Sequence, residues 1–215
     1  MGILGKLRHQ YQTNGAKEFA IWFTKKALMS LQAYLCDYHT SFVIERAIDE
    51  KIPDIHAKLP VRFVHGSVDD LMRFRHIRKP WGHYRKILED RFRSGRTCIL
   101  ALHENELIGY VWITDRPETD RNLGLTIRPA EGESYGFDLY VLPEYRKDLV
   151  GIELIIRWLE HARDGGKTKA IGVVSSKNQP MLVTTRLVFR FRRTREVRSV
   201  EFFKRWGYAA GAKEL

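Results

Sequence analysis

The sequence has little cysteine and no long apolar run. Its 215 residues include two cysteines, Cys36 and Cys98, each beside apolar residues. Two isolated cysteines allow no disulfide framework, and no cysteine pair has the spacing of a zinc module. We therefore expect no bound metal and a reducing, cytoplasmic setting. No apolar run approaches the roughly 18 residues of a membrane-spanning helix, so we also expect no membrane span.

Signals for export and lipid attachment are missing, as are several catalytic motifs. The opening residues, MGILGKLRHQYQTNG, contain no apolar core of signal-peptide length, and Lys6 stands where a myristoylation signal needs Ser or Thr. The sequence has no G-x-S-x-G, no Walker loop and no H-E-x-x-H. Hydrolases of the nucleophile-elbow type, P-loop nucleotide triphosphatases and zinc proteases therefore lack support.

Acidic residues are fewer than basic ones. There are 37 Lys and Arg against 26 Asp and Glu, which gives a formal net charge of +11. A positive field of this size attracts phosphate, nucleic acid or anionic lipid without choosing among them. Hydrophobic residues make up 44% and charged residues 29%, which is typical of a globular chain. The length suits one well-packed domain, alone or with an appendage.

The first 60 residues are expected to form a helical extension and a linker. Apolar residues at helical spacing predict a helix over about Ala16–Asp37, and Phe42–Ile48 fits either a short strand or a continuation of that helix. Residues 51–60 carry two prolines and are typical of a linker. The apolar stripe of the helix is expected to pack on the main domain or to pair in a homodimer, and a membrane surface is the alternative.

Residues 61–215 are expected to form the main domain, of the α/β class. Alternating and helical patterns predict, in order, a strand at Val61–His65, helices after Ser67 and at Trp81–Arg93, a hairpin at 97–115, a loop at Arg116–Glu133, a strand at Ser134–Pro143, a helix at Lys147–Arg163 and a strand at Lys169–Ser175. The last three form a βαβ unit, right-handed if the strands are parallel. We expect a mixed central sheet flanked by helices.

One segment carries a recognisable chemical motif. The strand ending at Pro143 is followed by a short turn and then by a helix with Gly151 in its first turn. A helix start presents several backbone N–H groups and the positive end of the helix dipole, which together suit a pyrophosphate. Arg146 and Lys147 add formal charge. The alternative is that Gly151 serves only close packing between helix and sheet, and that the two cations are solvated.

The segment Val141–Gly151, VLPEYRKDLVG, resembles the central motif of the GNAT superfamily of acyl-CoA-dependent N-acyltransferases, V-x-P-x-[YF]-[RQ]-x-x-G-x-[GA]. It departs from that motif at Leu149, where the family has its first glycine, and Asp148 adds a negative charge. The hairpin at 97–113 resembles the one that precedes the motif. The segment from Arg198 to the end resembles the closing helix and strand of the family, with Gly207–Tyr208 as its glycine–aromatic pair.

The resemblance implies a GNAT-like fold, acetyl-CoA as co-substrate and an amine as acceptor. It implies that the backbone of β-strand residues Leu139, Tyr140 and Val141 binds the pantetheine arm and that the following loop holds the pyrophosphate. The implied cofactor-binding residues of that loop are Arg146, Lys147, Asp148, Leu149, Val150, Gly151 and Ile152. Asn178 stands where the family often has an Asn that contacts the cofactor, and a turn or cap role is the alternative.

The resemblance also implies an amine attack on the thioester, an oxyanion held by backbone N–H groups near Val141, and a general base. Asp138 is the first candidate for the base, ahead of Glu133 and Glu106. A surface position or an ion pair is the alternative for Asp138. Phe203 stands where the family often has a tyrosine that protonates the departing thiolate, so water or Tyr208 is expected to supply that proton.

A basic segment near the C-terminus supports a second hypothesis. Residues 186–205 hold eight Lys and Arg interleaved with phenylalanines, a pattern that suits either a strand with one buried face or contact with nucleic acid. The alternative to an enzyme is therefore a weak or inactive GNAT-fold module that binds nucleic acid or an acidic protein. A longer acyl-CoA donor is a third hypothesis. The sequence does not identify the amine acceptor.

Overall fold

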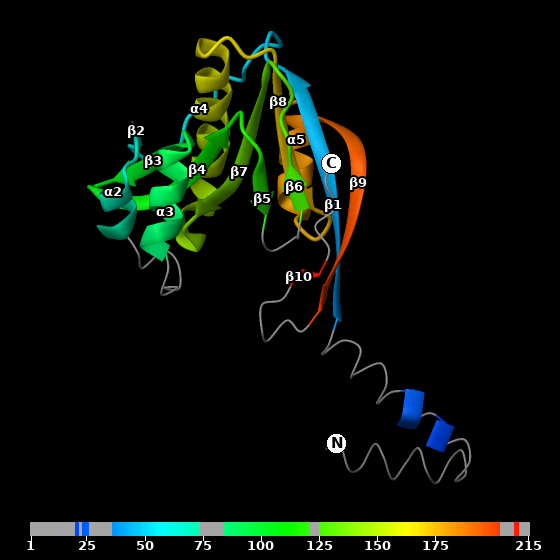
Figure 1. Cartoon of the computed structure of the whole chain (residues 1–215). Helices are drawn as coiled ribbons and strands as arrows, with labels where there is room; N and C mark the ends of the chain where they lie inside the picture. Colours follow the sequence, from blue (N-terminus) through cyan, green and yellow to red (C-terminus); the bar gives the residue numbers. More distant parts are fainter. Residues whose placement is uncertain are drawn as a thin grey trace.

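The computed structural model describes residues 20–21, 23–25, 36–73, 84–120, 125–202 and 209–210. They form one eight-stranded sheet of order β10-β9-β1-β8-β7-β4-β3-β2 and a separate β5–β6 pair (Figure 1). The strands are β1 (Cys36–Ala47), β2 (Arg62–His65), β3 (Thr97–His103), β4 (Glu106–Thr114), β5 (Glu118–Asp120), β6 (Leu125–Ile127), β7 (Glu133–Val141), β8 (Lys169–Ser175), β9 (Arg192–Phe202) and β10 (Ala209–Ala210). The helices are α2 (Val68–Arg73), α3 (Tyr84–Arg93), the 3-10 helix η2 (Pro143–Asp148), α4 (Val150–Asp164) and α5 (Gln179–Leu187).

The mixed sheet with flanking helices confirms the predicted fold class. All neighbouring strands of the sheet are antiparallel except β7 and β8, which are parallel and joined by α4. This is the predicted βαβ unit. None of the described helices is long and apolar enough to cross a bilayer.

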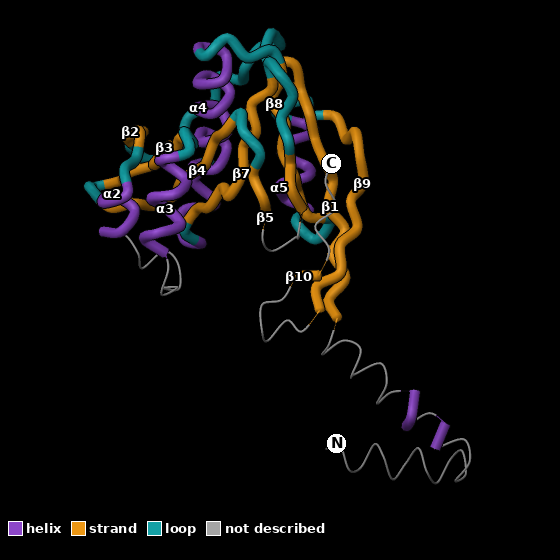
Figure 2. Tube along the Cα trace, in the orientation of Figure 1, coloured by secondary structure: helices purple, strands orange, loops and turns teal. Residues whose placement is uncertain are grey.

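Helices cover both faces of the sheet (Figure 2). Alternate residues of β3 and β4 point to opposite faces, as the period of a strand requires. On one face, Ile99 and Val111 lie in a core cluster with Leu154 and Leu159 of α4. On the other face a second cluster joins residues of α2 and α3 to the sheet: Leu71, Leu88, Cys98, Leu100 and Trp112. This part of the sheet is therefore covered on both faces, by α4 on one side and by α2 and α3 on the other.

Strand β1 corrects the expected domain boundary. Cys36 and Asp37, expected to end a helix, and Phe42–Ala47 belong to one strand that pairs with both β8 and β9. The sheet therefore begins upstream of residue 61. A local pattern did not reveal this because both partner strands lie more than a hundred residues further along the chain. Residues 20–21 and 23–25 are helical. The rest of the expected helix before residue 36, with its packing or dimer contact, lies outside the described residues.

The C-terminal region also differs from the prediction. Residues Arg198–Phe202, expected to open a closing helix, are part of strand β9, and the helix that follows β8 is α5. The segment pairs with β1 from Arg192 to Phe202, and this long-range pairing makes it a strand. Phe203, Gly207 and Tyr208 lie outside the described residues. The expected loop at 116–133 contains the short pair β5 and β6.

A segment between β1 and β2 crosses the outer side of α4. Ala57 N–H donates to the Glu153 carboxylate at 2.7 Å, and Lys58 N–H donates to the carbonyl of Asp148 at 2.9 Å. Glu153 is buried in the first turn of α4, where its negative charge interacts favourably with the positive end of the helix dipole. The linker that the sequence predicted is thus tied to the start of α4.

Two glycines face each other across β7 and β8 and provide a stability test. A Cβ on Gly136 would lie 2.6 Å from the ring of Trp158, whereas a Cβ on Gly172 would make an ordinary contact of 3.5 Å with Ile44. Trp158 is buried and its Nε1–H donates to Ser134 Oγ at 3.0 Å, so it cannot yield freely. Gly136→Ala is expected to lower the free energy of unfolding by about 1–3 kcal/mol, the usual cost of overpacking. The matched change Gly172→Ala should cost under about 1 kcal/mol in the same urea titration. Equal losses would contradict the contact with Trp158.

Candidate functional site

Strands β7 and β8 separate partway along their length. They pair only from Glu133 opposite Lys169 to Gly136 opposite Gly172. Beyond that point β7 continues to Val141, paired with β4 on its other side. Its second half therefore presents backbone groups toward β8 without a strand partner. An extended, amide-containing molecule can add to such an edge as a strand would.

A β-bulge explains the separation. Phe137 pairs with Trp112 and Tyr140 with Tyr110, so Asp138 and Leu139 together lie opposite Val111. Asp138 has a φ of 51°, which is unusual for a residue with a Cβ. A bulge bends its strand and increases the local twist, and bulges are common beside functional sites. Here the bulge begins at Asp138, two residues after the last pair between β7 and β8.

The bulge also places the three residues expected to bind a pantetheine arm. Leu139 and Val141 point toward α4 and its core cluster, and Tyr140 points the opposite way, stacked on Tyr110 at 5.9 Å between ring centroids. The backbone of these three residues lies on the half of β7 that β8 leaves.

The loop after β7 leads into the start of α4. Residues 143–148 form η2, Leu149 adopts a left-handed conformation, and α4 begins at Val150. The N–H groups of Ile152 and Glu153 both donate to the Leu149 carbonyl at 3.0 Å. Val150 and Gly151 are the first two residues of α4, and the N–H groups of a helix's first turn have no acceptor within that helix. These two groups, with the dipole of a 15-residue helix behind them, can receive an anion.

Packing does not explain why residue 151 is glycine. A Cβ there would lie 3.6 Å from Val141 Cγ2 and 3.9 Å from Leu139 Cδ2, both ordinary contacts. The close-packing alternative for Gly151 is therefore not supported. A bare backbone at the mouth of the loop is, however, what a close approach by a diphosphate requires.

The two cations of the loop, Arg146 and Lys147, are exposed. Arg146 donates from Nε to the Val141 carbonyl at 3.1 Å, which holds its guanidinium at the end of β7. Lys147 lies beside it on η2. Asp148 contributes its carbonyl to the bond with Lys58, so the loop is anchored from its outer side.

Leu149 occupies a conformation that glycine adopts more easily. Its φ is 64°, and a left-handed residue with a Cβ costs about 1–2 kcal/mol. Leu149→Gly and Leu149→Ala remove the same side-chain contacts beyond Cβ, but only the first relieves the strain. We expect the glycine variant to be more stable than the alanine variant by about 1 kcal/mol in a urea titration, although alanine is normally the better residue. An alanine variant that is equally or more stable would show that the loop is not strained at this position.

Asn178 lies at the same edge of the sheet, directly after β8. It is the N-cap of α5, and its Oδ1 accepts a hydrogen bond from Met181 N at 3.3 Å. The cap role that the sequence left open is thus present. It uses only the oxygen of the side-chain amide, so the exposed amide nitrogen is a donor for a further contact.

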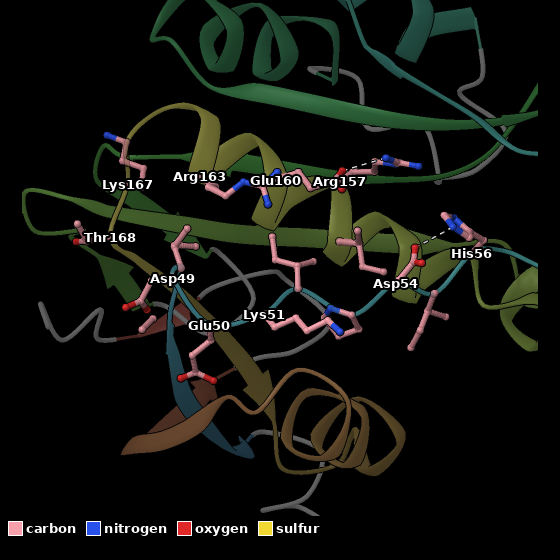
Figure 3. A pocket seen from close by; sticks show the side chains of 16 residues that line it. Asp49, Glu50, Lys51, Asp54, His56, Arg157, Glu160, Arg163, Lys167 and Thr168 are labelled. Atoms are coloured by element: carbon pink, nitrogen blue, oxygen red, sulfur yellow. Dashed lines mark hydrogen bonds and ion pairs between the residues drawn. The ribbon is translucent and has the colours of Figure 1, made fainter.

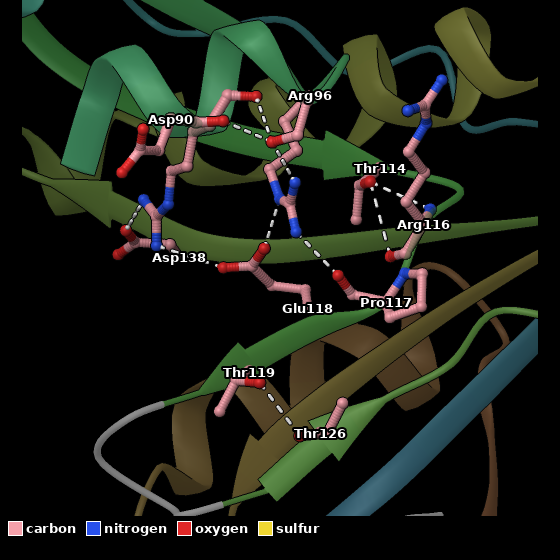
Figure 4. A network of polar contacts seen from close by, with 11 residues as sticks. Asp90, Arg96, Thr114, Arg116, Pro117, Glu118, Thr119, Thr126 and Asp138 are labelled. Carbon is pink, nitrogen blue, oxygen red and sulfur yellow. Dashed lines mark hydrogen bonds and ion pairs between the residues drawn. The ribbon is translucent and has the colours of Figure 1, made fainter. Parts of the chain in front are cut away.

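On the opposite face of the sheet a pocket of about 340 Å³ opens beside the bulge, between α3, β5 and β7. Figure 4 shows the polar contacts in this region, among them those of Asp138, Glu118 and Arg96. Asp138 pairs with Arg91 Nη1 at 2.9 Å, and Arg91 also reaches Glu118 at 3.6 Å. Arg96 donates to the same Glu118 carboxylate. The Arg91 guanidinium is stacked over Trp112 at 4.9 Å from the ring centroid. Ion pairing, one of the alternatives for Asp138, is therefore observed.

The charges of this pocket contrast with those of the whole chain. Its lining contains four acidic residues, Asp90, Glu118, Asp120 and Asp138, and two basic ones, Arg91 and Arg96. Tyr135 also lines it, and burial, with the nearby Asp120 and Glu118, raises the pKa of its hydroxyl above the ordinary value. That hydroxyl is therefore neutral at physiological pH. An acidic pocket with aromatic walls suits a cationic molecule.

Several residues of this pocket are not identifiable from the sequence. Arg91 and Glu118 lie 47 and 20 residues from Asp138 in the chain, and no motif links them. The weaker base candidates lie elsewhere: Glu133 pairs with Lys169 at 3.3 Å at the far end of β7, and Glu106 is exposed in the β3–β4 hairpin. Tyr208 lies outside the described residues.

A larger pocket of about 640 Å³ lies between residues 47–56 and α4 (Figure 3). Two ion-pair contacts join residues of its lining. Arg157 pairs with Glu160 at 3.0 Å, and His56 with Asp54 at 3.1 Å. This pocket shows no convergent set of reactive groups. Among the described residues, no cluster of three or more His, Cys, Asp or Glu is arranged to hold a metal ion.

Comparison with known proteins agrees with this geometry. The sequence model of the acetyltransferase (GNAT) family matches residues 67–182. Among solved structures, the chain is similar to a GCN5-related N-acetyltransferase from Sphaerobacter thermophilus, with a TM-score of 0.57 and 10% identity over 89% of this chain and 58% of that one. It is also similar to a Drosophila protein, with a TM-score of 0.54 and 11% identity over 84% of this chain and 57% of that one.

A third similar structure is AAC(6')-Iy in complex with a bisubstrate analogue, CoA-S-monomethyl-acetylneamine, with a TM-score of 0.51 and 13% identity over 63% of this chain and 94% of that one. At these identities the similarity shows the fold. The chain spans a little over half the length of the Sphaerobacter and Drosophila proteins. Among curated proteins, none matches it in sequence.

Proposed function

Since the chain belongs to the acetyltransferase (GNAT) family, we propose that it transfers an acetyl group from acetyl-CoA to a primary amine. One observation carries the proposal: at a single edge of the sheet, β7 leaves β8 at a bulge and the loop that follows opens into the start of α4. An unpaired strand edge and a helix start, joined by the eight residues 142–149, match a ligand with an amide-rich arm and a diphosphate.

Two parts of the site bind the co-substrate in this proposal. The backbone of Leu139, Tyr140 and Val141 hydrogen-bonds the amides of the pantetheine arm. The N–H groups of Val150 and Gly151 hold the pyrophosphate, with Arg146 and Lys147 supplying charge. The remaining loop residues, Asp148, Leu149 and Ile152, shape this turn, and the side-chain nitrogen of Asn178 donates from the neighbouring helix.

The thioester then lies at the bulge, between the loop on one face of the sheet and the acidic pocket on the other. The amine nitrogen attacks the acetyl carbonyl, and backbone N–H groups near Val141 stabilise the oxyanion. Asp138 accepts the amine proton, directly or through a water molecule. When the intermediate collapses, the C–N bond remains, the C–S bond breaks, and the thiolate takes a proton from water or from Tyr208.

Arg91 positions Asp138 in this mechanism. The guanidinium is held by Glu118 on one side and stacked on Trp112 and Phe137, so the carboxylate is fixed at the bulge. The four carboxylates of the pocket favour an acceptor that is positively charged before reaction. This charge pattern supports an amine acceptor over an alcohol.

A coupled assay tests the proposal. The protein is incubated with acetyl-CoA and a panel of amines, namely polyamines, lysine peptides, peptide N-termini, aminoglycosides and amino sugars, and free thiol release is followed. We expect release that depends on both substrates, and a thermal shift with acetyl-CoA alone. A ligand at about 100 times its dissociation constant stabilises a fold by about 2.7 kcal/mol. No shift with acetyl-CoA and no thiol release with any amine would overturn the proposed function.

A further inference from the structure

The segment from the end of α5 into β9 carries an unusual density of arginine. Between residues 186 and 198 there are six arginines, no lysine and one acidic residue, Glu196. Five of them form what we name the arginine surface, and all five are exposed: Arg186, Arg190, Arg192, Arg193 and Arg195. The sixth, Arg198, pairs with Glu196 at 2.7 Å. The proposed acetyl transfer uses none of the five.

The arginine surface is not neutralised within the described part of the chain. None of its five guanidinium groups has a carboxylate within ion-pair distance there. By contrast, six other arginines each pair with at least one carboxylate: Arg85, Arg91, Arg93, Arg96, Arg157 and Arg163. Clustered like charges repel one another and lower the stability of a fold. A cluster of five exposed arginines with no carboxylate partner among the described residues can bind an external anion.

The cluster surrounds a hollow. A cavity of about 430 Å³ has Ile44, Leu182 and Phe191 on its floor and four of the five arginines, all but Arg195, around it. Arg193 is stacked over the ring of Phe42, at 4.4 Å from the centroid, which limits its freedom before any ligand arrives. Guanidinium groups held in this way bind phosphate oxygens in pairs with little further ordering.

The arginine surface lies away from the loop that starts α4. Glu45 of β1 pairs with Ile171 near the start of β8 and also with Arg192, so β9 begins beside the start of β8. The α4 loop follows the opposite end of the parallel strand β7. In Figure 1, β9 runs along the outer side of the sheet, beyond β1. Apart from Glu201 and Val200, which pair with β10, its outer edge has no strand partner among the described residues.

Arginines of this surface project from both faces of strand β9. Val197 packs in a cluster with Ile171 and Tyr135, on the face away from α4 and α5, and Arg195 lies two residues before it on the same face. Arg193 lies on the other face, in the hollow beside Leu182 of α5. A flat bilayer reaches only one such face, and a protein partner usually needs an apolar centre to its interface. A flexible polyanion can follow both faces.

The aromatic residues of the segment expose too little surface to stack on a base, although Phe191 lines the hollow. Phe189 and Phe191 are buried, with 0% and 3% of their surface exposed. They are unavailable to stack on bases, so contact depends on the phosphates alone. We propose that the arginine surface binds the phosphate backbone of a single-stranded nucleic acid without sequence preference.

The test is fluorescence anisotropy with fluorescein-labelled oligothymidylate of about 20 nucleotides, a length that covers one domain. For five arginines the slope of log K against log salt is expected to be about −3.5. The variant Arg190→Gln/Arg192→Gln/Arg193→Gln should bind at least about tenfold more weakly and reduce the steepness of that slope by about 2. A mixed-sequence oligonucleotide of the same length should bind equally well.

A charge-matched variant provides the control. Arg85→Gln/Arg93→Gln/Arg163→Gln removes the same net charge from exposed, paired arginines and should change affinity by less than about threefold. Thermal melts of both variants confirm folding, and thiol release with acetyl-CoA should be the same for both. Equal losses in the two variants would overturn the proposal. So would binding to phosphatidylserine vesicles or to polyglutamate at the same salt without binding to the oligonucleotide. The readout is independent of acetyl transfer, so either proposal can fail alone.

Discussion

Gly151→Asp is expected to weaken acetyl-CoA binding on the order of 100-fold. A carboxylate at this position lies within the first turn of α4, beside a diphosphate held by the N–H groups of Val150 and Gly151. Like charges about 6 Å apart in a partly solvated site repel by a few kcal/mol in total. Isothermal titration with acetyl-CoA measures the loss directly, and a melt without ligand shows whether the fold is intact.

The matched control is Gly151→Asn, which has the same shape without the charge. The structure accepts a Cβ at residue 151 with ordinary contacts, so both variants should fold. The asparagine variant is expected to lose less than about tenfold in affinity, because it adds bulk but no repulsion. If both variants bind acetyl-CoA as the parent does, the diphosphate does not occupy this loop and the assignment fails.

Asp138→Asn is expected to lower kcat by about 100-fold to 10,000-fold, the usual contribution of a positioned general base. The change keeps the size of the side chain but removes its ability to take the amine proton. Acetyl-CoA binding should be nearly unchanged, because the pocket that holds Asp138 lies on the opposite face of the sheet from α4. Steady-state rates with the best amine, together with acetyl-CoA titration, separate the two effects.

Glu133→Gln is the control for that variant. It is the same kind of change on the same strand, but Glu133 pairs with Lys169 at the far end of β7. It should leave kcat within about threefold, since a partly exposed ion pair contributes little to the site. A parent-like rate for Asp138→Asn would remove Asp138 from the mechanism. A large loss of kcat in Glu133→Gln would instead favour Glu133 as the general base.

The loop from Val141 to Gly151 is the part of the site that the sequence predicts well. Its features follow one another in consecutive residues: a strand, a proline, a turn, two cations and a helix with a glycine in its first turn. The expected anion binding therefore follows from local rules for helix starts. The departure at Leu149 is visible in the sequence too. Only the structure shows that this leucine adopts the left-handed conformation that the family's glycine would favour.

Long-range pairing was not predictable in the same way. The sequence places the residues of strand β1 in an N-terminal extension. Its partners β8 and β9 lie far along the chain, and the local pattern of apolar residues in β1 does not indicate which strands it pairs with. Residues Arg198–Phe202 resemble the start of the family's closing helix in sequence, but they form the end of strand β9. In both places the neighbouring strands decided the outcome over local pattern.

The sequence alone determined the family, the α/β class and the loop before α4, because these depend on residues adjacent in the chain and on the period of helix and strand. The tertiary structure decided where β7 leaves β8, which carboxylate faces Arg91, and which arginines remain without a partner. Those features depend on distances between residues that are far apart in the chain. A bulge, an ion pair and an unpaired cluster of charges exist only once the sheet has brought their members together.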